Sequence, residues 1–148
     1  MTLDPSDGAV DVAEGADVGT HALVYQICEA ANPSNCAQAT VTVTVMPYVV
    51  TAVNDAARAS SKVPGTAIAS VLANDWLGSA PATTANVSLS LVSLSPANDD
   101  IRLDLSDGSV DVLRRTQSGT YRLVYQICEV WSPGNCGQAT VTLDLSGK

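Results

Sequence analysis

One stretch of the sequence occurs twice without change: Leu23-Val24-Tyr25-Gln26-Ile27-Cys28-Glu29 returns as Leu123-Val124-Tyr125-Gln126-Ile127-Cys128-Glu129. Around it, residues 3–45 align with residues 103–145 at a constant offset of 100, with 25 identical residues in 43 positions and no gap. A period of this length is too long for one turn of a solenoid and matches the size of a β-sandwich domain. Each period is therefore expected to form one domain.

The 148 residues hold about one and a half of these periods. The boundary is expected at Met46-Pro47, because proline cannot donate to a β-ladder and is common where a strand ends. Residues 47–148 are then a complete module. Residues 1–46 correspond to the C-terminal half of a preceding module, with three or four strands.

The composition is typical of an all-β protein. Hydrophobic residues make up 46% of the chain, charged residues 15%, and there is no phenylalanine. Valine, threonine and serine are abundant, and β-branched side chains pack well on a pleated sheet. No helix is expected in the complete module, where strand signals alternate with turn residues. The seven expected strands are 49–59, 66–73, 86–94, 100–105, 109–113, 119–130 and 136–145.

The alternation of side chains assigns the faces of the last two strands. The residues expected to face the core are Tyr121, Leu123, Tyr125 and Ile127 on one strand, and Ala139, Val141, Leu143 and Leu145 on the other. Cys128 then lies opposite Cys136, and Gln126 lies opposite Gln138. The register is self-consistent along both strands.

The cysteines form two pairs with the same spacing, Cys28/Cys36 and Cys128/Cys136. Zinc sites use shorter cysteine spacings and further ligands, and the chain has one histidine, which disfavours metal. A disulfide across the end of a hairpin fits the register and is worth about 2–3 kcal/mol. Such bonds persist in oxidising compartments, so we expect an extracellular or cell-surface location.

Charge and motifs exclude several functions. The net charge of −8 disfavours nucleic acid, and no apolar stretch is long enough for membrane insertion. The start lacks a signal peptide, so we expect either export signals upstream or an excised piece. His21 has the core-facing Tyr121 as its repeat partner and is expected to pack like it. With no catalytic motif, no enzyme activity is expected.

Four segments together resemble a known family: "VTAVNDAA" (50–57), "VLANDW" (71–76), "GTYRLVYQIC" (119–128) and "CGQATVTLDL" (136–145). They are similar to bacterial immunoglobulin-like or cadherin-like tandem repeats of large secreted surface proteins and adhesins. The resemblance implies an immunoglobulin-like Greek-key β-sandwich of about seven strands. It also implies a non-catalytic stalk or spacer, with neighbouring repeats as partners and calcium as a frequent stiffening ion.

A calcium site is one candidate at the module's N-terminal pole. In a sandwich of this type Asn54-Asp55 begins the first strand and Asn74-Asp75 ends the second, so the two pairs are expected to meet there, with Asp107 from the hairpin turn nearby. Calcium prefers six to eight oxygen ligands of these types. Asn-Asp and Asp-Gly are also ordinary turn formers, and this alternative stays open.

Two tryptophans give a second candidate site. Trp76 and Trp131 lie in loops expected at the same pole, and the repeat partner of Trp131 is Ala31. Such an aromatic pair could stack on a carbohydrate or bind a protein partner. A plain loop-packing or interdomain contact is the alternative.

Residues 1–46 lack half of a sandwich, which leaves an apolar face and open sheet edges. Three interpretations follow: a piece cut from a tandem array, a homodimer that pairs two such faces, or an assembly in which a partner donates strands.

Overall fold

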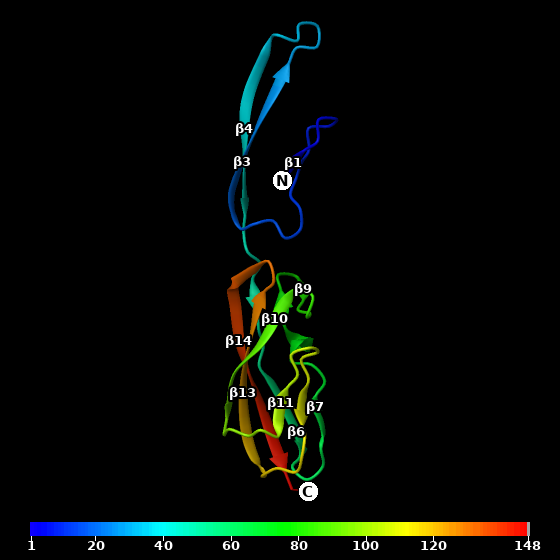
Figure 1. Ribbon diagram of the computed structural model, residues 1–148, viewed down its shortest axis with the longest axis vertical. Helices are drawn as coiled ribbons and strands as arrows, with labels where there is room; N and C mark the ends of the chain where they lie inside the picture. The colour runs from blue at the N-terminus through cyan, green and yellow to red at the C-terminus, as the bar shows by residue number, and fades with distance from the viewer. Residues whose placement is uncertain (148) are drawn as a thin grey trace. The chain divides into compact units, whose positions relative to one another are not determined.

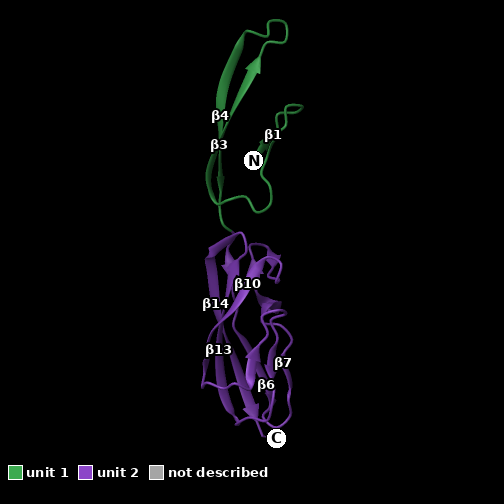
Figure 2. Cartoon of the chain, viewed as in Figure 1, with its two compact units in different colours: residues 1–47 green, residues 48–148 purple. Residues whose placement is uncertain are grey.

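The computed structural model describes residues 1–147 and is all-β, apart from one 3-10 turn (Figure 1). The chain divides into two compact units, a first unit of Met1–Pro47 and a second unit that begins at Tyr48 (Figure 2). Among the described residues, no helix has the length and apolar character needed to cross a membrane.

The first layer of the second unit is a four-stranded sheet in the order β10-β13-β14-β6. Its strands are β10 (Val87–Ser95), β13 (Gly119–Glu129), β14 (Ser132–Ser146) and β6 (Asp55–Ser60). Strand β13 pairs antiparallel with both β10 and β14. Strand β6 pairs in parallel with β14, so an early strand of the unit lies beside its last strand.

The second layer consists of shorter strands. Strands β11 (Ile101–Leu103), β12 (Val110–Val112) and β7 (Gly65–Ile68) form one three-stranded sheet. Strands β5 (Val50–Thr51), β8 (Trp76–Leu77) and β9 (Ala80–Pro81) form another. One hydrophobic cluster contains residues from both layers, so the unit is a β-sandwich, as expected from the sequence.

The register expected from side-chain alternation is confirmed. Strand β13 places Cys128 opposite Cys136 and Gln126 opposite Gln138. The eight residues expected to face the core are all buried: Tyr121, Leu123, Tyr125, Ile127, Ala139, Val141, Leu143 and Leu145. Both expected disulfides are present, Cys28–Cys36 and Cys128–Cys136.

The strands expected near the N-terminal pole differ from those observed. The expected strand 49–59 is interrupted between β5 and β6, because these two segments pair with different sheets. The end of the expected strand 66–73 is the 3-10 turn η1 (Val71–Asn74), with the Ser70 hydroxyl accepting the Leu72 N–H at its start. The β8–β9 hairpin was not anticipated, since its strands have two residues each and carry no alternation signal.

The first unit contains two hairpins. Strand β1 (Thr2–Leu3) pairs with β2 (Val10–Asp11), and β3 (Gly19–Cys28) pairs with β4 (Cys36–Val45). The β3–β4 register equals that of β13–β14 shifted by 100 residues, from Gly19/Val45 to Cys28/Cys36. Within the first unit, each of these strands pairs with one other strand only.

Candidate functional site

The hydroxyl group of Tyr125 lies at the centre of a polar cluster inside the second unit. Tyr125 is fully buried on β13, and its hydroxyl oxygen lies 2.9 Å from Asp75 Oδ2 and 3.3 Å from Asp55 Oδ2. The backbone carbonyl oxygens of Val53 and Val71 lie 3.1 and 3.3 Å from the same hydroxyl. One hydroxyl hydrogen therefore faces four acceptor oxygen atoms, contributed by segments that precede β10.

Asp75 is held in this cluster by the end of the 3-10 turn. Its own N–H donates to the Leu72 carbonyl at 3.1 Å, which places the side chain inward at 1% exposure. Its Oδ1 accepts the Val53 N–H at 2.7 Å, while Oδ2 accepts the Tyr125 hydroxyl. Both carboxylate oxygens thus have protein donors. Asp75 joins the segment before β6, the 3-10 turn and β13.

Asp55 begins β6 and is half-buried beside Asp75. Burial, and secondly the negative charge of Asp75, raise the pKa of Asp55 to about 6. Burial likewise raises the pKa of Asp75, against the opposing hydrogen bonds from Val53 and Tyr125. The pKa of Tyr125 is also raised, by burial first and then by its bond to Asp75. A proton on Asp55 relieves the excess of acceptors around one hydroxyl.

The side chains of Asn54 and Asn74 form hydrogen bonds with backbone groups at the same pole. Asn54 Oδ1 accepts the Thr140 N–H at 2.9 Å and so joins the start of β6 to β14. Asn74 Nδ2 donates to the Asn54 carbonyl at 3.4 Å. Among residues 1–147, Asn74 Oδ1 is the buried side-chain oxygen that lacks a hydrogen-bond partner. The structure thus brings Asn54-Asp55 and Asn74-Asp75 together at one place.

Asp107 does not join this cluster. The Gly108 carbonyl next to it accepts the Val71 N–H at 2.8 Å, so the turn does lie beside the 3-10 turn. The Asp107 carboxylate, however, accepts the Ser109 N–H of its own turn at 2.9 Å and is exposed. In the first unit its repeat partner Asp7 makes the same bond, to the Ala9 N–H at 2.9 Å. This residue has a turn-forming role in both copies.

The residues expected to bind calcium make hydrogen bonds within the protein, and calcium binding by them stays a prediction. A calcium ion takes six to eight oxygen ligands, several of them carboxylates. Both oxygens of Asp75 accept protein hydrogen bonds, which leaves mainly Asp55 and the free Asn74 Oδ1 as candidate side-chain ligands. Within the described residues, no three His, Cys, Asp or Glu side chains are grouped so as to hold a metal ion. The carboxylates are arranged as hydrogen-bond acceptors for the protein.

The tryptophans lie at partly exposed positions. Trp76 is 44% exposed on β8, where it lies opposite Thr51 and Pro81. Trp131 is 39% exposed in the connection between β13 and β14. Near this connection, Asn135 Nδ2 donates to Glu129 Oε2 at 2.8 Å and to the Tyr48 carbonyl at 2.6 Å. The connection is thus fixed to the start of the unit.

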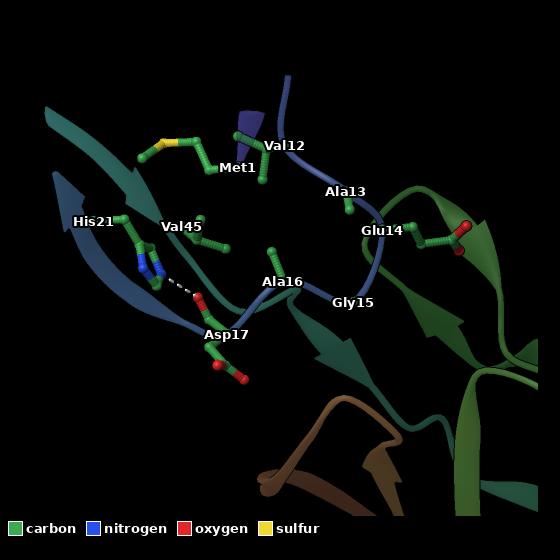
Figure 3. Close-up of a pocket in the computed structure, with 9 residues that line it drawn as sticks. All are labelled: Met1, Val12, Ala13, Glu14, Gly15, Ala16, Asp17, His21 and Val45. Carbon is green, nitrogen blue, oxygen red and sulfur yellow. Dashed lines mark hydrogen bonds between the residues drawn. The ribbon is translucent and has the colours of Figure 1, made fainter. Parts of the chain in front are cut away.

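His21 lines a hollow of about 350 Å³ in the first unit (Figure 3). Its Nε2 bonds the Asp17 carbonyl at 2.7 Å, just as the Tyr121 hydroxyl bonds the Gln117 carbonyl at 2.9 Å in the second unit. His21 therefore takes the place of the tyrosine. The other lining residues are Met1, Val12, Ala13, Glu14, Gly15, Ala16, Asp17 and Val45.

The role of Tyr125 in this cluster was not predicted from the sequence, which placed the residue only on the core face. The available signal is that a buried tyrosine hydroxyl normally has a hydrogen-bond partner. The carboxylates of "VNDA" and "LAND" are the polar groups expected at the same pole, so the three residues could have been connected from the sequence.

No protein-family model and no curated protein matches this sequence. Among solved structures, the protocadherin GammaB4 extracellular domain is similar over 75% of this chain and 19% of its own, with 10% identity and a TM-score of 0.46. PcdhgB3 EC1-4 is similar over 86% of this chain and 32% of its own, with 12% identity and a TM-score of 0.46. This chain thus spans a fifth to a third of their lengths. At these scores, the fold assignment rests on the strand pairing described above.

The raised pKa of Asp55 predicts that the substitution Asp55→Asn changes how stability depends on pH. The folded-state pKa of Asp55 is about 6 and the ordinary value is 3.8. The contribution of protonated Asp55 to the free energy of unfolding is therefore fully present below about pH 3.8 and is lost as pH rises through 6. For a half-buried group we expect this change in the free energy of unfolding to be about 1–2 kcal/mol.

Urea unfolding between pH 4 and 7, followed by tryptophan fluorescence, measures the effect. Both tryptophans lie in the second unit, so the signal reports that unit. We expect Asp55→Asn to gain stability relative to the unsubstituted chain as pH rises. Parallel curves for the two proteins would contradict the raised pKa.

Proposed function

We propose that this chain is a non-catalytic extracellular spacer, from a tandem array of the kind found in bacterial surface adhesins. The parallel pairing of β6 with β14 carries this proposal. Six residue pairs join these strands, from Asp55/Val141 to Ser60/Ser146. The strands run in the same direction, so tension between Tyr48 and Gly147 slides one along the other and loads their hydrogen bonds together.

Two further features support the spacer. The disulfides close the hairpin loops Cys28–Cys36 and Cys128–Cys136 and are typical of exported proteins. The polar cluster around Tyr125 is buried and joins strands of its own module. The bacterial adhesin assignment rests on the sequence resemblance alone.

Single-molecule stretching tests the proposal. With handles at Tyr48 and Gly147, we expect the second unit to unfold in one cooperative event at high force, and at the same force with calcium or with a chelator. The matched control moves the second handle to Gly134, an exposed residue near the start of β14. Tension from there peels β14 from β6 one pair at a time, so the unfolding force is expected to fall markedly.

Equal unfolding forces in the two directions would contradict a load-bearing role for the β6–β14 pairing. A higher force in calcium than in chelator would show that calcium stiffens the module and that the cluster around Asp55 should be assigned to it.

A further inference from the structure

The two long hairpins are nearly identical in sequence but differ in what covers them. Ile127 is 0% exposed and its repeat partner Ile27 is 66% exposed. We call the inward side of β3–β4 the hairpin face; by the common register it consists of Leu23, Tyr25, Ile27, Ala39, Val41 and Val43. None of these residues is fully buried. The hairpin β13–β14 therefore shows which contacts the hairpin β3–β4 lacks.

In the second unit, residues 48–102 supply that cover. Strand β10 adds antiparallel to the edge of β13, and β6 adds in parallel to the edge of β14. In the first unit, the corresponding edges of β3 and β4 pair with no strand among residues 1–47. Both edges and the apolar face between them are therefore open in the form that strand addition uses.

Two polar side chains on the first hairpin, Asn35 and Tyr25, correspond to residues that bond the covering segment in the second unit. Asn35 Nδ2 donates to Glu29 Oε2 at 3.0 Å, as Asn135 does to Glu129 at 2.8 Å. Asn135 also donates to a carbonyl of the covering segment, that of Tyr48, and Asn35 has no such bond within residues 1–47. In the same range the Tyr25 hydroxyl makes no hydrogen bond, whereas that of Tyr125 has the two carboxylates.

Besides Asn35 and Tyr25, the hollow beside His21 is a third place where the first unit lacks a contact that the second unit has (Figure 3). In the second unit Asn98 occupies the equivalent neighbourhood, where its Nδ2 donates to Thr116 Oγ1 at 2.6 Å and to the Tyr121 hydroxyl at 3.1 Å. His21 stands where Tyr121 would, so an amide side chain arriving at the hollow would meet the imidazole ring.

We propose that the hairpin face binds a polypeptide segment of the same kind as residues 48–102. The segment adds one strand parallel to β4 and one antiparallel to β3, and it places a pair of aspartates against the Tyr25 hydroxyl. This inference goes beyond the spacer function, whose stretching test loads only the second unit.

A second copy of this chain does not supply the missing segment. Each chain has two such hairpins, β3–β4 and β13–β14, and one covering segment. Exchange of covering segments between any number of copies leaves one hairpin per chain uncovered. The segment therefore comes from outside these 148 residues.

Ala37 makes the first hairpin differ from the second in the covering segment that it accepts. A Cβ atom on Gly137 would lie 3.2 Å from Val50 Cγ1 of the covering segment, and the repeat partner of Gly137 is Ala37. The first hairpin thus favours a covering segment with a smaller residue than Val50 at this point. The substitution Ala37→Gly is expected to improve the fit of a segment that carries valine.

The test adds a separate polypeptide with the sequence of residues 48–102 to the full chain. We expect native mass spectrometry and titration to show a 1:1 complex. Ile27→Asp should abolish it by placing a charge on the hairpin face. Ala22→Asp is the matched control and should leave binding unchanged, because Ala22 lies on the outward face, where its repeat partner Arg122 is exposed and charged.

A double-mutant cycle tests the carboxylate contact. Tyr25→Phe in the chain and Asp75→Asn in the added polypeptide should each weaken binding by about tenfold, and the two together by little more than either alone. Additive effects would overturn the contact. Absence of the complex, binding that Ile27→Asp leaves intact, or a homodimer that excludes the polypeptide would overturn the proposal.

Discussion

The substitution Ile127→Ala is expected to lower the free energy of opening of β13 by about 2–5 kcal/mol, whereas Ile27→Ala should change that of β3 by less than about 0.5 kcal/mol. Ile127 is 0% exposed in the core, so its truncation removes buried methyl groups and leaves a cavity. Ile27 is 66% exposed, and its truncation leaves none. Amide hydrogen exchange measures the two strands separately in one protein.

The repeat makes this a matched pair. Both isoleucines lie between Gln and Cys within the same seven-residue stretch, so local propensity and the nearby disulfide are equal. The two positions differ in their cover and in the cross-strand partner, which is Ala37 for Ile27 and Gly137 for Ile127. A small effect at Ile127 would contradict the sandwich core. A large effect at Ile27 in the isolated chain would mean that the hairpin face is already covered in solution.

The sequence predicted those parts of the fold that local rules control. Alternation along two long strands fixes which side chains face the core, and the cysteines at equal distances from the turn fix the pairing of Cys128 with Cys136. The interruption between Thr51 and Asp55 could not be predicted in this way, because it depends on β5 and β6 pairing with different sheets. Short elements such as β8 and β9 likewise depend on distant partners.

The candidate site shows a similar limit. The sequence indicated that Asn54-Asp55 and Asn74-Asp75 meet, and the structure brings them together around Tyr125. It did not separate metal ligands from hydrogen-bond acceptors, since aspartate serves both roles with the same residue type. The distinction depends on which donors face each carboxylate, and those are set by the tertiary structure.

Repeat partners help to separate these roles within one chain. Asp107 and Asp7 make the same turn bond although one hairpin lies in a complete sandwich and the other does not. A role that persists in both contexts is local. Tyr125 and Tyr25, by contrast, have identical neighbours in sequence and different hydrogen bonds, so the role of Tyr125 depends on the covering segment.

Asp75→Ala is accordingly expected to destabilise the second unit by about 1–3 kcal/mol. The substitution leaves the Val53 N–H without the acceptor of its part-buried hydrogen bond, and an unsatisfied donor costs about this much. The Tyr125 hydroxyl loses its nearest acceptor but keeps the other three acceptor oxygens of the cluster. Part of this cost is offset, because loss of the Asp75 charge also lowers the pKa of Asp55. Urea unfolding at pH 7, followed by tryptophan fluorescence, measures the net effect.

Asp107→Ala is the control for Asp75→Ala. It removes one part-buried turn bond, to the Ser109 N–H, and should cost about 0.5–1 kcal/mol. If the carboxylates served calcium instead, Asp75→Ala would cost little in chelator and much in calcium, since a metal-binding residue stabilises only when its ion is bound. If Asp75 stabilises the fold through its hydrogen bonds around Tyr125, the cost of Asp75→Ala should be the same in calcium and in chelator. It should also be clearly larger than the cost of Asp107→Ala.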